Sequence, residues 1–558
     1  MSTRKVNEGV YGPGTFTDAE EASLPNECYR LLKYMAKITP GFVRNEADLD
    51  SVTFHGHDLP IVPGPLKSQA MSAVLNAMIG IVGRDICSIR GFETGKIDID
   101  VDKAGLYPET PALVSVSGKG LAEIQKDGTL LKAGKDVDGQ ILTKNAMHYR
   151  TWAIFPTKYP KVWYQLLGNL DPAGFLRAYG LDPEAPVSTR DEAYELIKSV
   201  TVKYSAAELD MINMEHGFCG QTCYTPAQWR TTQMAKRLRE HPVIDVERKR
   251  EASDLPSIPF PSSQDPRPLA GIKIVELARV IAGPAMGSAL AAFGADVIKV
   301  FSPNLHELQR TCALDLTVQE DKEKLQSLID EADVVVQAFR QGPLERKGFG
   351  LDAVLEMDTR RKKGIVYVDL NCYGPDGYYA ERPGFQQIAD AASGCSYVVG
   401  KSLGLPEGTA VLPPLPIADM LSGAVSVIDI MLALRARALE GGSYHACVAL
   451  TSVDTIQLER EVGLYPPETV KRIQERYNFA KMAPDLHVEE LLYVLGDAWT
   501  KNSDLMTRKG YMVNVPKTAW GENHSILSSI VKFENYAASP RWDHGPVPYF
   551  LHKDTTWS

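Results

Sequence analysis

A turn of three small residues is the first place where this sequence could hold a ligand. Ala282, Gly283 and Pro284 follow an apolar run at 272–277 and open a stretch rich in alanine and glycine. If that stretch is helical, its first backbone N–H groups favour an anionic or phosphate-bearing ligand. The alternative is structural, because small residues let a helix approach a sheet closely and no GxGxxG or P-loop spacing is present. The spacing alone favours the structural alternative.

The turn lies inside a predicted β-α-β unit at 269–300. The run 272–277 carries only two charges and is typical of a largely buried strand. A helix-forming stretch at 285–293 follows the turn, and the segment GADVIKV at 294–300 ends that helix and begins a second strand. A strand, a helix and a second strand in this order predict an α/β fold.

This unit resembles the opening of the class III CoA-transferases, the CaiB/BaiF family, which contains formyl-CoA transferase, carnitine CoA-transferase and α-methylacyl-CoA racemase. Enzymes of that family begin with a strand, an AGP turn, a small-residue helix and the sequence GADVIKVE. Here AGP stands at 282–284 and GADVIKV at 294–300. The resemblance implies doubly wound Rossmann-like sheets, a smaller α+β domain and an enzyme that acts on an acyl-CoA.

A helix, a turn and a strand occur twice in the chain. The first copy has an apolar helix at 66–84 and an alternating strand at 97–101, and the second copy occupies 415–450. Both copies resemble a single segment of the family. The repeat predicts two fused family-like units, and the alternative is convergence of two ordinary helix–strand pairs.

The resemblance also divides the chain. We expect an N-terminal CoA-transferase-like unit at 1–251, with the family's smaller domain at 110–240 and a helix of that domain at 161–167. A stretch rich in Pro, Ser and Asp predicts a linker at 252–268. The C-terminal unit, at 269–558, is expected to contain the Rossmann-like domain. Two chains interlock as rings in the family, so we expect a homodimer or an intramolecular pseudo-dimer.

In the family, as the resemblance implies, a carboxylate in a PG[YF]D motif attacks the acyl-CoA carbonyl and forms covalent intermediates. The matching segment here is RPGFQQIADAASG at 382–394, and Gln386 occupies the place of the aspartate. An amide is a poor nucleophile and cannot act as a general base near neutral pH. Asp390 lies one helical turn further on, on the same face. It is either the carboxylate of a shifted pocket, with Gln386 donating a hydrogen bond to an acyl oxygen, or a polar contact.

Three functions remain open. The first is an acyl-CoA:carboxylate CoA-transferase-like enzyme that acts on the CoA thioester of a small or medium organic acid. The second is an isomerase, epimerase or lyase that reuses the pocket. The racemase branch pairs a carboxylate with a histidine, but no histidine occurs between His306 and His445. The third is a catalytically degenerate CoA-binding protein, and we favour the transferase.

Three arginines and two apolar residues match positions near the CoA in the family. Arg279, Val280 and Ile281 stand before the AGP turn, where the family contacts the CoA moiety. Arg310 matches the basic residue of the family's NKRS motif and could pair with a phosphate bidentately. Arg340 follows a predicted strand, whose carboxyl end would face a ligand crevice. A solvated surface charge explains each arginine alone, and three at ligand-side strand ends favour a binding role.

A further carboxylate belongs to a segment that resembles the family's PIADM motif. Asp419 stands there, at the beginning of the second apolar helix. An aspartate at a helix N-terminus can accept hydrogen bonds from backbone N–H groups. We therefore expect Asp419 to cap its helix.

The composition bounds the remaining classes. The chain has 558 residues, 44% of them apolar, which suffices for several domains. Its 60 basic and 70 acidic residues give a net charge of -10, which argues against a general nucleic-acid binder and a polybasic membrane surface. Eight scattered cysteines are expected to be reduced thiols, and no run approaches a transmembrane span. We expect a cytoplasmic protein whose partners are an acyl-CoA and a carboxylic acid, with coenzyme A as the substrate thioester and no metal or redox cofactor.

Overall fold

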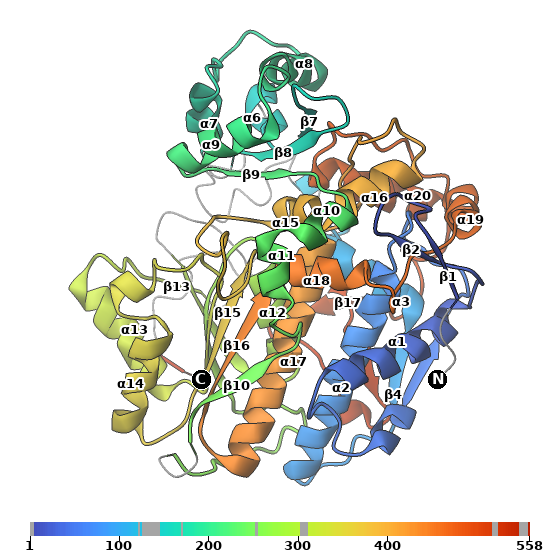
Figure 1. Ribbon diagram of the computed structural model, residues 1–558. Helices are drawn as coiled ribbons and strands as arrows, with labels where there is room; N and C mark the ends of the chain where they lie inside the picture. The colour runs from blue at the N-terminus through green and yellow to red at the C-terminus, as the bar shows by residue number, and fades with distance from the viewer. Residues whose placement is uncertain are drawn as a thin grey trace.

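The computed structural model describes residues 5–120, 123–124, 145–168, 171–251, 255–301, 311–515, 523–545 and 556–557. Its largest element is a seven-stranded sheet with the strand order β10-β16-β15-β14-β11-β12-β13 (Figure 1). All neighbours pair in parallel except β10, which runs antiparallel beside β16. The predicted β-α-β unit corresponds to β11, α12 and β12. The bounds are β10 (Val246–Arg250), β11 (Lys273–Leu277), α12 (Ala282–Ala292), β12 (Asp296–Phe301), β13 (Thr311–Ala313), β14 (Val334–Gln337), β15 (Val366–Asn371) and β16 (Ser443–Ala449).

Helices cover both faces of this sheet. On one face, α12 and α17 (Ile417–Glu440) pack on alternate strand residues. On the other face, α13 (Gln319–Glu331) and α14 (Leu351–Arg361) pack on the residues between them. A sheet that is buried on both faces needs apolar residues on both sides of each strand, and β14 meets this need with three successive buried valines. The predicted α/β class is confirmed.

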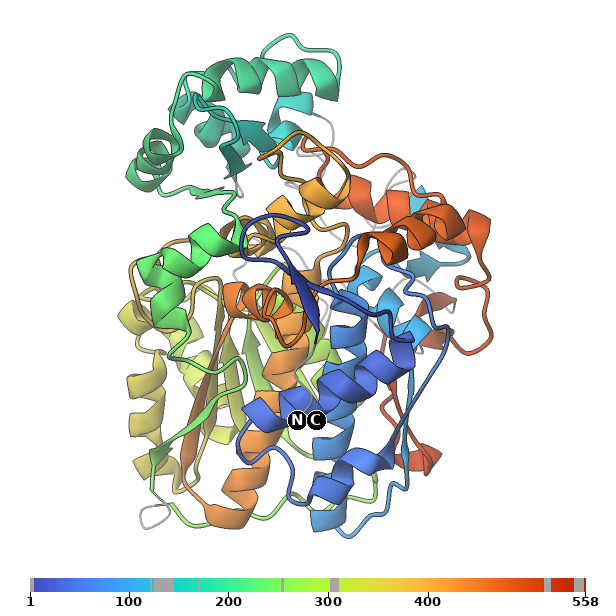
Figure 2. The same cartoon turned by 45° about the vertical axis from the view of Figure 1, so that its right-hand side comes forward.

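A second, smaller sheet combines two strands of the N-terminal half of the chain with one strand of the C-terminal half. Its order is β19-β4-β3, with β4 (Ile97–Asp100) parallel to β3 (Val52–His55) and antiparallel to β19 (Val531–Phe533). Helices α1 (Leu24–Ile38) and α2 (Ser68–Ile89) pack on this sheet, and α2 also packs along α17 (Figure 2). One hydrophobic core therefore spans both halves.

Two helix–strand–helix units face one another across this core. In the first, α2 leads to β4 and then to α3 (Val101–Leu106), and in the second α17 leads to β16 and then to α18 (Leu450–Gln457). Each of these strands has a parallel neighbour on one side, β3 or β15, and an antiparallel neighbour on the other, β19 or β10. Each antiparallel strand comes from the opposite half of the chain. The exchanged strands interlock the two halves.

Helices α2 and α17 are long and apolar enough to cross a membrane by length and composition, with mean hydropathies of 1.4 and 1.9. The prediction that no run approaches a membrane span was therefore wrong. The fold gives another reason for their composition, because both helices lie in the core and contact one another. A helix that is buried on all sides is apolar on all sides.

A smaller antiparallel domain stands at the top of Figure 1. Its sheet has the order β7-β8-β9, and it has a hydrophobic core of its own. The prediction of a helix at 161–167 was wrong, because Trp163 and the residues after it pair with strands on both sides. The bounds are α6 (Ala146–Arg150), β7 (Ile154–Pro156), β8 (Trp163–Leu167), α7 (Pro172–Ala178), α8 (Arg190–Thr201), α9 (Ala206–His216) and β9 (Cys219–Thr222).

The first part of the predicted smaller domain at 110–240 lies elsewhere in the molecule. Strands β5 (Val114–Val116) and β6 (Lys119–Gly120) join β17 (Met512–Val515) and β18 (His524–Leu527) in a four-stranded sheet. The remaining strands and α-helices that the structure describes are β1 (Val6–Glu8), β2 (Phe16–Asp18), α10 (Pro226–Thr231), α11 (Gln233–Leu238), α15 (Gln386–Ser393), α16 (Cys395–Ser402), α19 (Pro467–Tyr477) and α20 (Val488–Asn502).

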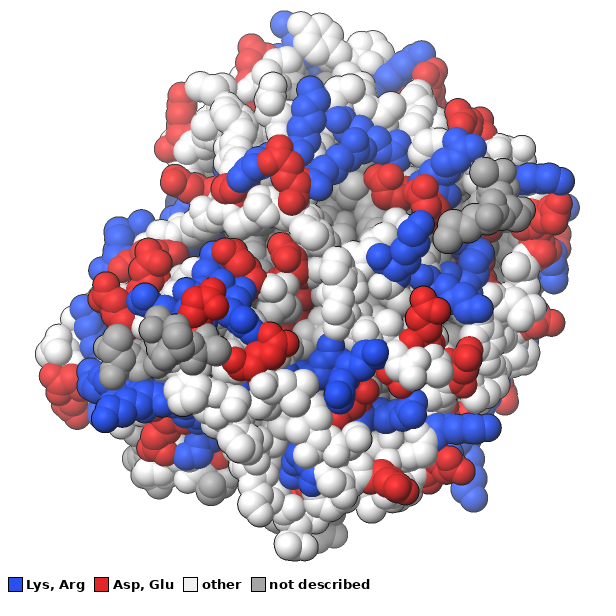
Figure 3. All heavy atoms as spheres, turned by 60° about the horizontal axis from the view of Figure 1, so that its bottom comes forward, with Lys and Arg blue, Asp and Glu red and all other residues white. Residues whose placement is uncertain are grey.

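The face at the bottom of Figure 1 carries charges of both signs. Lys and Arg are interspersed there with Asp and Glu, and the described residues form no broad field of one sign on it (Figure 3). This distribution accords with the near balance of 60 basic and 70 acidic residues.

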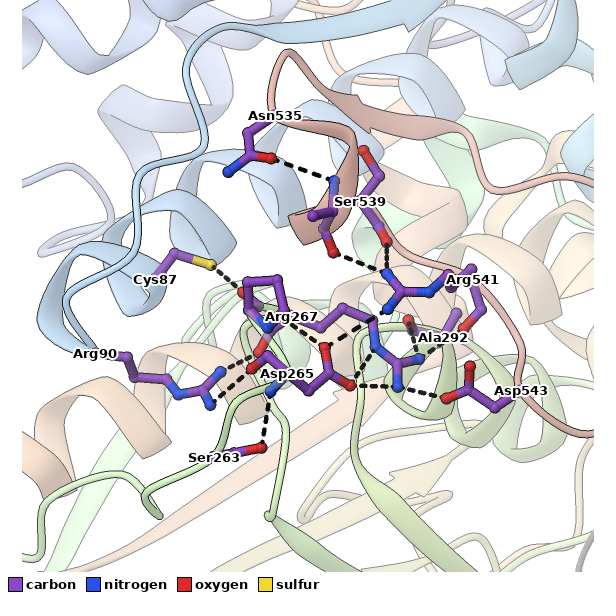
Figure 4. A network of polar contacts seen from close by, with 12 residues as sticks. Cys87, Arg90, Ser263, Asp265, Arg267, Ala292, Asn535, Ser539, Arg541 and Asp543 are labelled. Atoms are coloured by element: carbon purple, nitrogen blue, oxygen red, sulfur yellow. Dashed lines mark hydrogen bonds and ion pairs between the residues drawn. The ribbon is translucent and has the colours of Figure 1, made fainter.

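The predicted linker at 252–268 is fastened to both halves (Figure 4). Arg267 donates to the carboxylate of Asp265 at 2.5 Å and to the carbonyl of Arg541 at 2.9 Å. From α2, Arg90 donates to the carbonyl of Asp265 at 3.1 Å. The described part of this segment therefore ties α2 to the C-terminal segment of the chain.

Candidate functional site

A cavity of about 530 Å³ lies between the large sheet and the smaller domain. Residues that follow β11, β14 and β15, the first turns of α12 and α17, and two segments of the smaller domain form its walls. The carboxyl ends of parallel strands are the usual place of a ligand crevice in an open α/β sheet. The lining residues are Asp171, Gly217, Phe218, Arg279, Val280, Ile281, Ala282, Gly283, Ala338, Phe339, Arg340, Pro343, Leu370, Asn371, Cys372, Arg382, Pro383, Gly384, Phe385, Asp419 and Leu450.

The turn before α12 is built for close packing. A Cβ atom on Gly283 would lie 2.2 Å from the Cβ of Ala278, so only glycine fits. From the other side, a Cβ on Gly423 of α17 would lie 2.9 Å from the carbonyl oxygen of Ala282. Val280 has a φ of 73°, a left-handed conformation that strains a β-branched residue, and its side chain is 43% exposed. The structural interpretation of this turn is confirmed, and its strained residue also lines the cavity.

Four of the five predicted CoA contacts lie on the wall of this one cavity, namely Arg279, Val280, Ile281 and Arg340. Arg279 is half-buried and Arg340 is exposed, so both guanidinium groups are open to a ligand from solvent. Guanidinium groups suit the phosphates of CoA. Arg310 lies outside the described residues. The binding role of all five stays a prediction.

Gln386 and Asp390, the predicted catalytic pair, are buried in α15 and are not among the residues that line the cavity. They share a helical face as predicted, because Gln386 Nε2 donates to Asp390 Oδ2 at 3.2 Å. The same amide donates to the carbonyl of Leu415 at 3.0 Å. Burial, and then the carboxylate of Asp454, raises the pKa of Asp390 well above its usual range. A buried neutral acid is a poor nucleophile, so the catalytic role of the pair stays a prediction and their contacts favour a structural one.

The buried carboxylate on the cavity wall is Asp419, the third residue of α17. The prediction that it caps its helix was wrong, because Pro416 occupies the N-cap position and no side chain caps the helix. No described residue donates a hydrogen bond to it, and burial raises its pKa to about 7. A buried carboxylate that opens onto a cavity and titrates near neutral pH is a candidate catalytic group.

The sequence contained a signal for this residue. Between 415 and 434 the only charged residues are Asp419 and Asp429. A carboxylate inside a buried apolar helix costs stability, and such a group marks a functional candidate. The structure separates the two, because Asp429 does not line the cavity and accepts a hydrogen bond from the backbone N–H of Asp245 at 3.1 Å.

The described residues also include histidines, cysteines and further acidic residues. They contain no group of three or more His, Cys, Asp or Glu side chains that could hold a metal ion. None of the eight cysteines, all of which the structure describes, forms a disulfide. The cavity wall carries two carboxylates, the exposed Asp171, which caps α7, and the buried Asp419, together with several arginines that could bind anions.

Comparisons with known proteins show the family of the chain. A family model described as CoA-transferase family III matches residues 269–312 and 301–476. An acyl-CoA transferase of Gibberella moniliformis is 44% identical over 572 aligned residues, which cover 100% of both chains. The acetyl-coenzyme A transferase nodX of Hypoxylon pulicicidum is 30% identical over 455 residues and covers 76% of this chain and 74% of its own. A crystal structure of a CaiB/BaiF family protein from Brucella suis aligns with 51% of this chain and 97% of its own, at 19% identity and a TM-score of 0.35.

Proposed function

This chain belongs to CoA-transferase family III, and from that premise we propose that it transfers coenzyme A from an acyl-CoA to a small or medium carboxylic acid. One observation carries the proposal. Asp419 places a buried carboxylate on the wall of a cavity that is also lined by Arg279 and Arg340. The arginines bind the phosphates of CoA, and the carboxylate reacts with the thioester.

Asp419 supplies the nucleophile in this proposal. One of its oxygens attacks the thioester carbonyl. The C–S bond then breaks, so that CoA leaves as a thiolate and a mixed anhydride of Asp419 and the acyl group is formed. The thiolate attacks the Asp419 carbonyl, releases the donor acid and leaves an aspartyl thioester. The acceptor carboxylate then displaces the thiolate, which attacks the acceptor side of the new anhydride, forms the new acyl-CoA and regenerates Asp419.

The predicted pair in α15 takes a supporting role in this account. Gln386 joins α15 to the segment before α17 through the carbonyl of Leu415. Asp390 accepts from Gln386 and lies beside the carboxyl group of Asp454. Because α15, α17 and α18 pack on one another, these contacts fix the first turn of α17, where Asp419 stands.

The finer architecture is also part of the proposal: one chain forms an intramolecular pseudo-dimer of two family-like units with a single site. The matched helix–strand–helix units support it, since each has one parallel and one exchanged antiparallel neighbour. The third residue of α17 is Asp419, whereas the third residue of α2 is Ala70. The N-terminal unit therefore lacks a carboxylate at the equivalent position. The eight free thiols support a place in the cytoplasm.

Product formation tests the proposal. The purified protein is incubated with acetyl-CoA, succinyl-CoA or hexanoyl-CoA and a panel of carboxylic acids, and new CoA thioesters are detected by mass spectrometry. We expect at least one new thioester from the wild type and none from the D419N variant. If CoA binds in calorimetry but no pair of substrates exchanges, the transferase proposal fails and an isomerase, epimerase, lyase or degenerate CoA-binding protein remains.

A further inference from the structure

The cavity wall carries a third guanidinium group, which comes from Arg382. Resting on the proposed function, we propose that Arg382 binds the carboxylate of the acid substrate, and that a polar chain in the smaller domain holds its guanidinium group in place. Arg279 and Arg340 follow strands of the large sheet, whereas Arg382 stands in the loop before α15. The side chain of Arg382 is 16% exposed and lines the same cavity as Asp419.

The polar chain begins in the core of the smaller domain. Tyr179 donates to Asn213 Oδ1 at 2.9 Å, and Asn213 Nδ2 donates to the Tyr164 hydroxyl at 3.2 Å. Tyr164 donates in turn to Asp210 Oδ1 at 2.5 Å. The other oxygen of Asp210 accepts from Arg382 Nη1 at 3.3 Å. A buried chain of this kind fixes the position of its last member.

Two glycines are required for this arrangement. A Cβ on Gly220 would lie 2.0 Å from Asn213 Nδ2, inside the chain. A Cβ on Gly384 would lie 2.5 Å from the Sγ of Cys372, so only glycine lets the loop that carries Arg382 run this close to Cys372. Both ends of the contact are therefore shaped by close packing.

The guanidinium group keeps donors for a ligand. It stacks over the ring of Tyr379 at 4.1 Å, and Nη2 lies 2.6 Å from the thioether of Met214, a weak acceptor. An arginine has five N–H donors, so most of them have no strong acceptor among the described residues. By contrast, the guanidinium group of Arg237 donates hydrogen bonds to both carboxylate oxygens of Asp376, at 2.6 and 2.5 Å. The guanidinium group of Arg382 keeps N–H donors for a ligand, stacks on Tyr379 and is held by Asp210. Such a group suits bidentate binding of a carboxylate.

Anion binding at Arg382 has two possible sources, a carboxylate or a phosphate of CoA, and position favours the carboxylate. Arg279 and Arg340 already stand at the ends of β11 and β14, beside the N-terminus of α12, where phosphates are expected. Arg382 faces the cavity from the side of the smaller domain, whose residues Asp171 and Phe218 also line it. An acid held there shares the cavity with Asp419 and does not compete with CoA for Arg279 and Arg340.

Binding measurements separate these sources. Isothermal titrations with succinate, hexanoate and CoA are made on the wild type, on R382K and on the double variant R382Q/D210N, which leaves no stranded buried charge. The double variant should weaken the binding of at least one acid by about tenfold or more and leave CoA within about twofold, since a lost charge-assisted pair costs roughly 1.5 kcal/mol or more. The affinity of R382K for the acid should lie between those of the wild type and the double variant, because lysine keeps the positive charge but cannot bind a carboxylate bidentately. R340Q is the matched control and should weaken CoA instead.

Asp210 is a positioning residue in this proposal, and kinetics test it. D210N should raise the KM for the acceptor acid several-fold and leave kcat and the KM for the acyl-CoA nearly unchanged, and D210E should restore part of the effect. If the double variant weakens CoA and not the acids, or if the wild type binds neither acid, the proposal is overturned. If the wild type binds an acid through Arg382 but forms no new thioester, the proposed function fails and this assignment stands.

Discussion

The two long helices at the centre of the molecule begin in different ways. α17 places Asp419 at its third position, on the wall of the cavity. α2 has Ala70 at that position, and the residue before the helix, Lys67, is fully buried in ion pairs with Asp18 at 2.5 Å and Glu27 at 2.6 Å. The two helix–strand units thus carry different charged groups at the start of their helices, Lys67 before α2 and Asp419 in α17. One is paired and structural, and the other is available for chemistry.

Burial explains why the two ends differ. A buried charge without a partner destabilises a fold, so Lys67 is surrounded by carboxylates. Asp419 avoids that cost differently, because its pKa of about 7 lets it take up a proton. The price is a group that is only partly ionised near neutral pH, which is also what lets it serve as a reactive carboxylate once a ligand enters.

Removing the carboxylate from α17 should have the largest effect. D419N keeps the shape and removes the nucleophile, so kcat should fall by about 10³-fold or more. The matched control is D429N, on the same helix and away from the cavity, and its kcat should stay within about threefold of the wild type. Formation of the new thioester is followed by mass spectrometry. If D419N keeps more than a tenth of the activity, Asp419 is not the nucleophile and the proposed difference between the starts of α17 and α2 is wrong.

Removing the charge from the start of α2 should affect stability and spare activity. K67M removes the buried cation that Asp18 and Glu27 share, while Arg30 keeps its ion pair with Glu27, and the free energy of unfolding should drop by roughly 3 kcal/mol. Urea denaturation followed by circular dichroism measures the change. K161M, which breaks the exposed pair with Glu407, should leave the midpoint unchanged. A kcat loss in K67M at unchanged stability would show that the N-terminal unit takes part in the reaction.

Removing the Asp419 carboxylate should also change how the stability of the protein depends on pH. The pKa of Asp419 is raised from 3.8 to about 7 by folding, so its protonated form stabilises the folded state below pH 4 and this stability is lost as the pH rises to about 7. Relative to D419N, the wild type should lose at most roughly 4 kcal/mol across that window. kcat should rise over its upper part, because the ionised form attacks. A difference between the two proteins that stays flat from pH 4 to 8 would contradict the assignment.

The smallest effect concerns the strained turn before α12, which lines the same cavity as Asp419. V280G relieves a left-handed valine and should stabilise the fold by about 1 kcal/mol, while the KM for the acyl-CoA rises a few-fold. Ser117, which also has a positive φ of 52° but lies away from the cavity, provides the control. S117G should stabilise the protein without changing that KM. Equal behaviour of the two variants would show that the strain at 280 serves the fold only.

The sequence was informative where chemistry follows from a local pattern. The β-α-β unit, the helical face shared by Gln386 and Asp390, and four residues of the cavity wall could all be predicted. The sequence of α15 does not reveal that Gln386 and Asp390 face other buried groups, so the isolated charge of Asp419 in an apolar helix was passed over in favour of that pair. The pairing of the exchanged strands β10 and β19 could not be predicted either, because their partner strands lie far away in the sequence. Arg382 became a candidate only when the smaller domain was seen to hold it.

The most direct test of the account maps the covalent intermediate. The wild type is incubated with a productive acyl-CoA, treated with borohydride to reduce an enzyme thioester to the alcohol, digested and analysed by mass spectrometry. The account predicts one modified residue per chain, in the peptide that contains Asp419, and none in D419N. Modification of the peptide that contains Asp390, or two modified sites per chain, would contradict it.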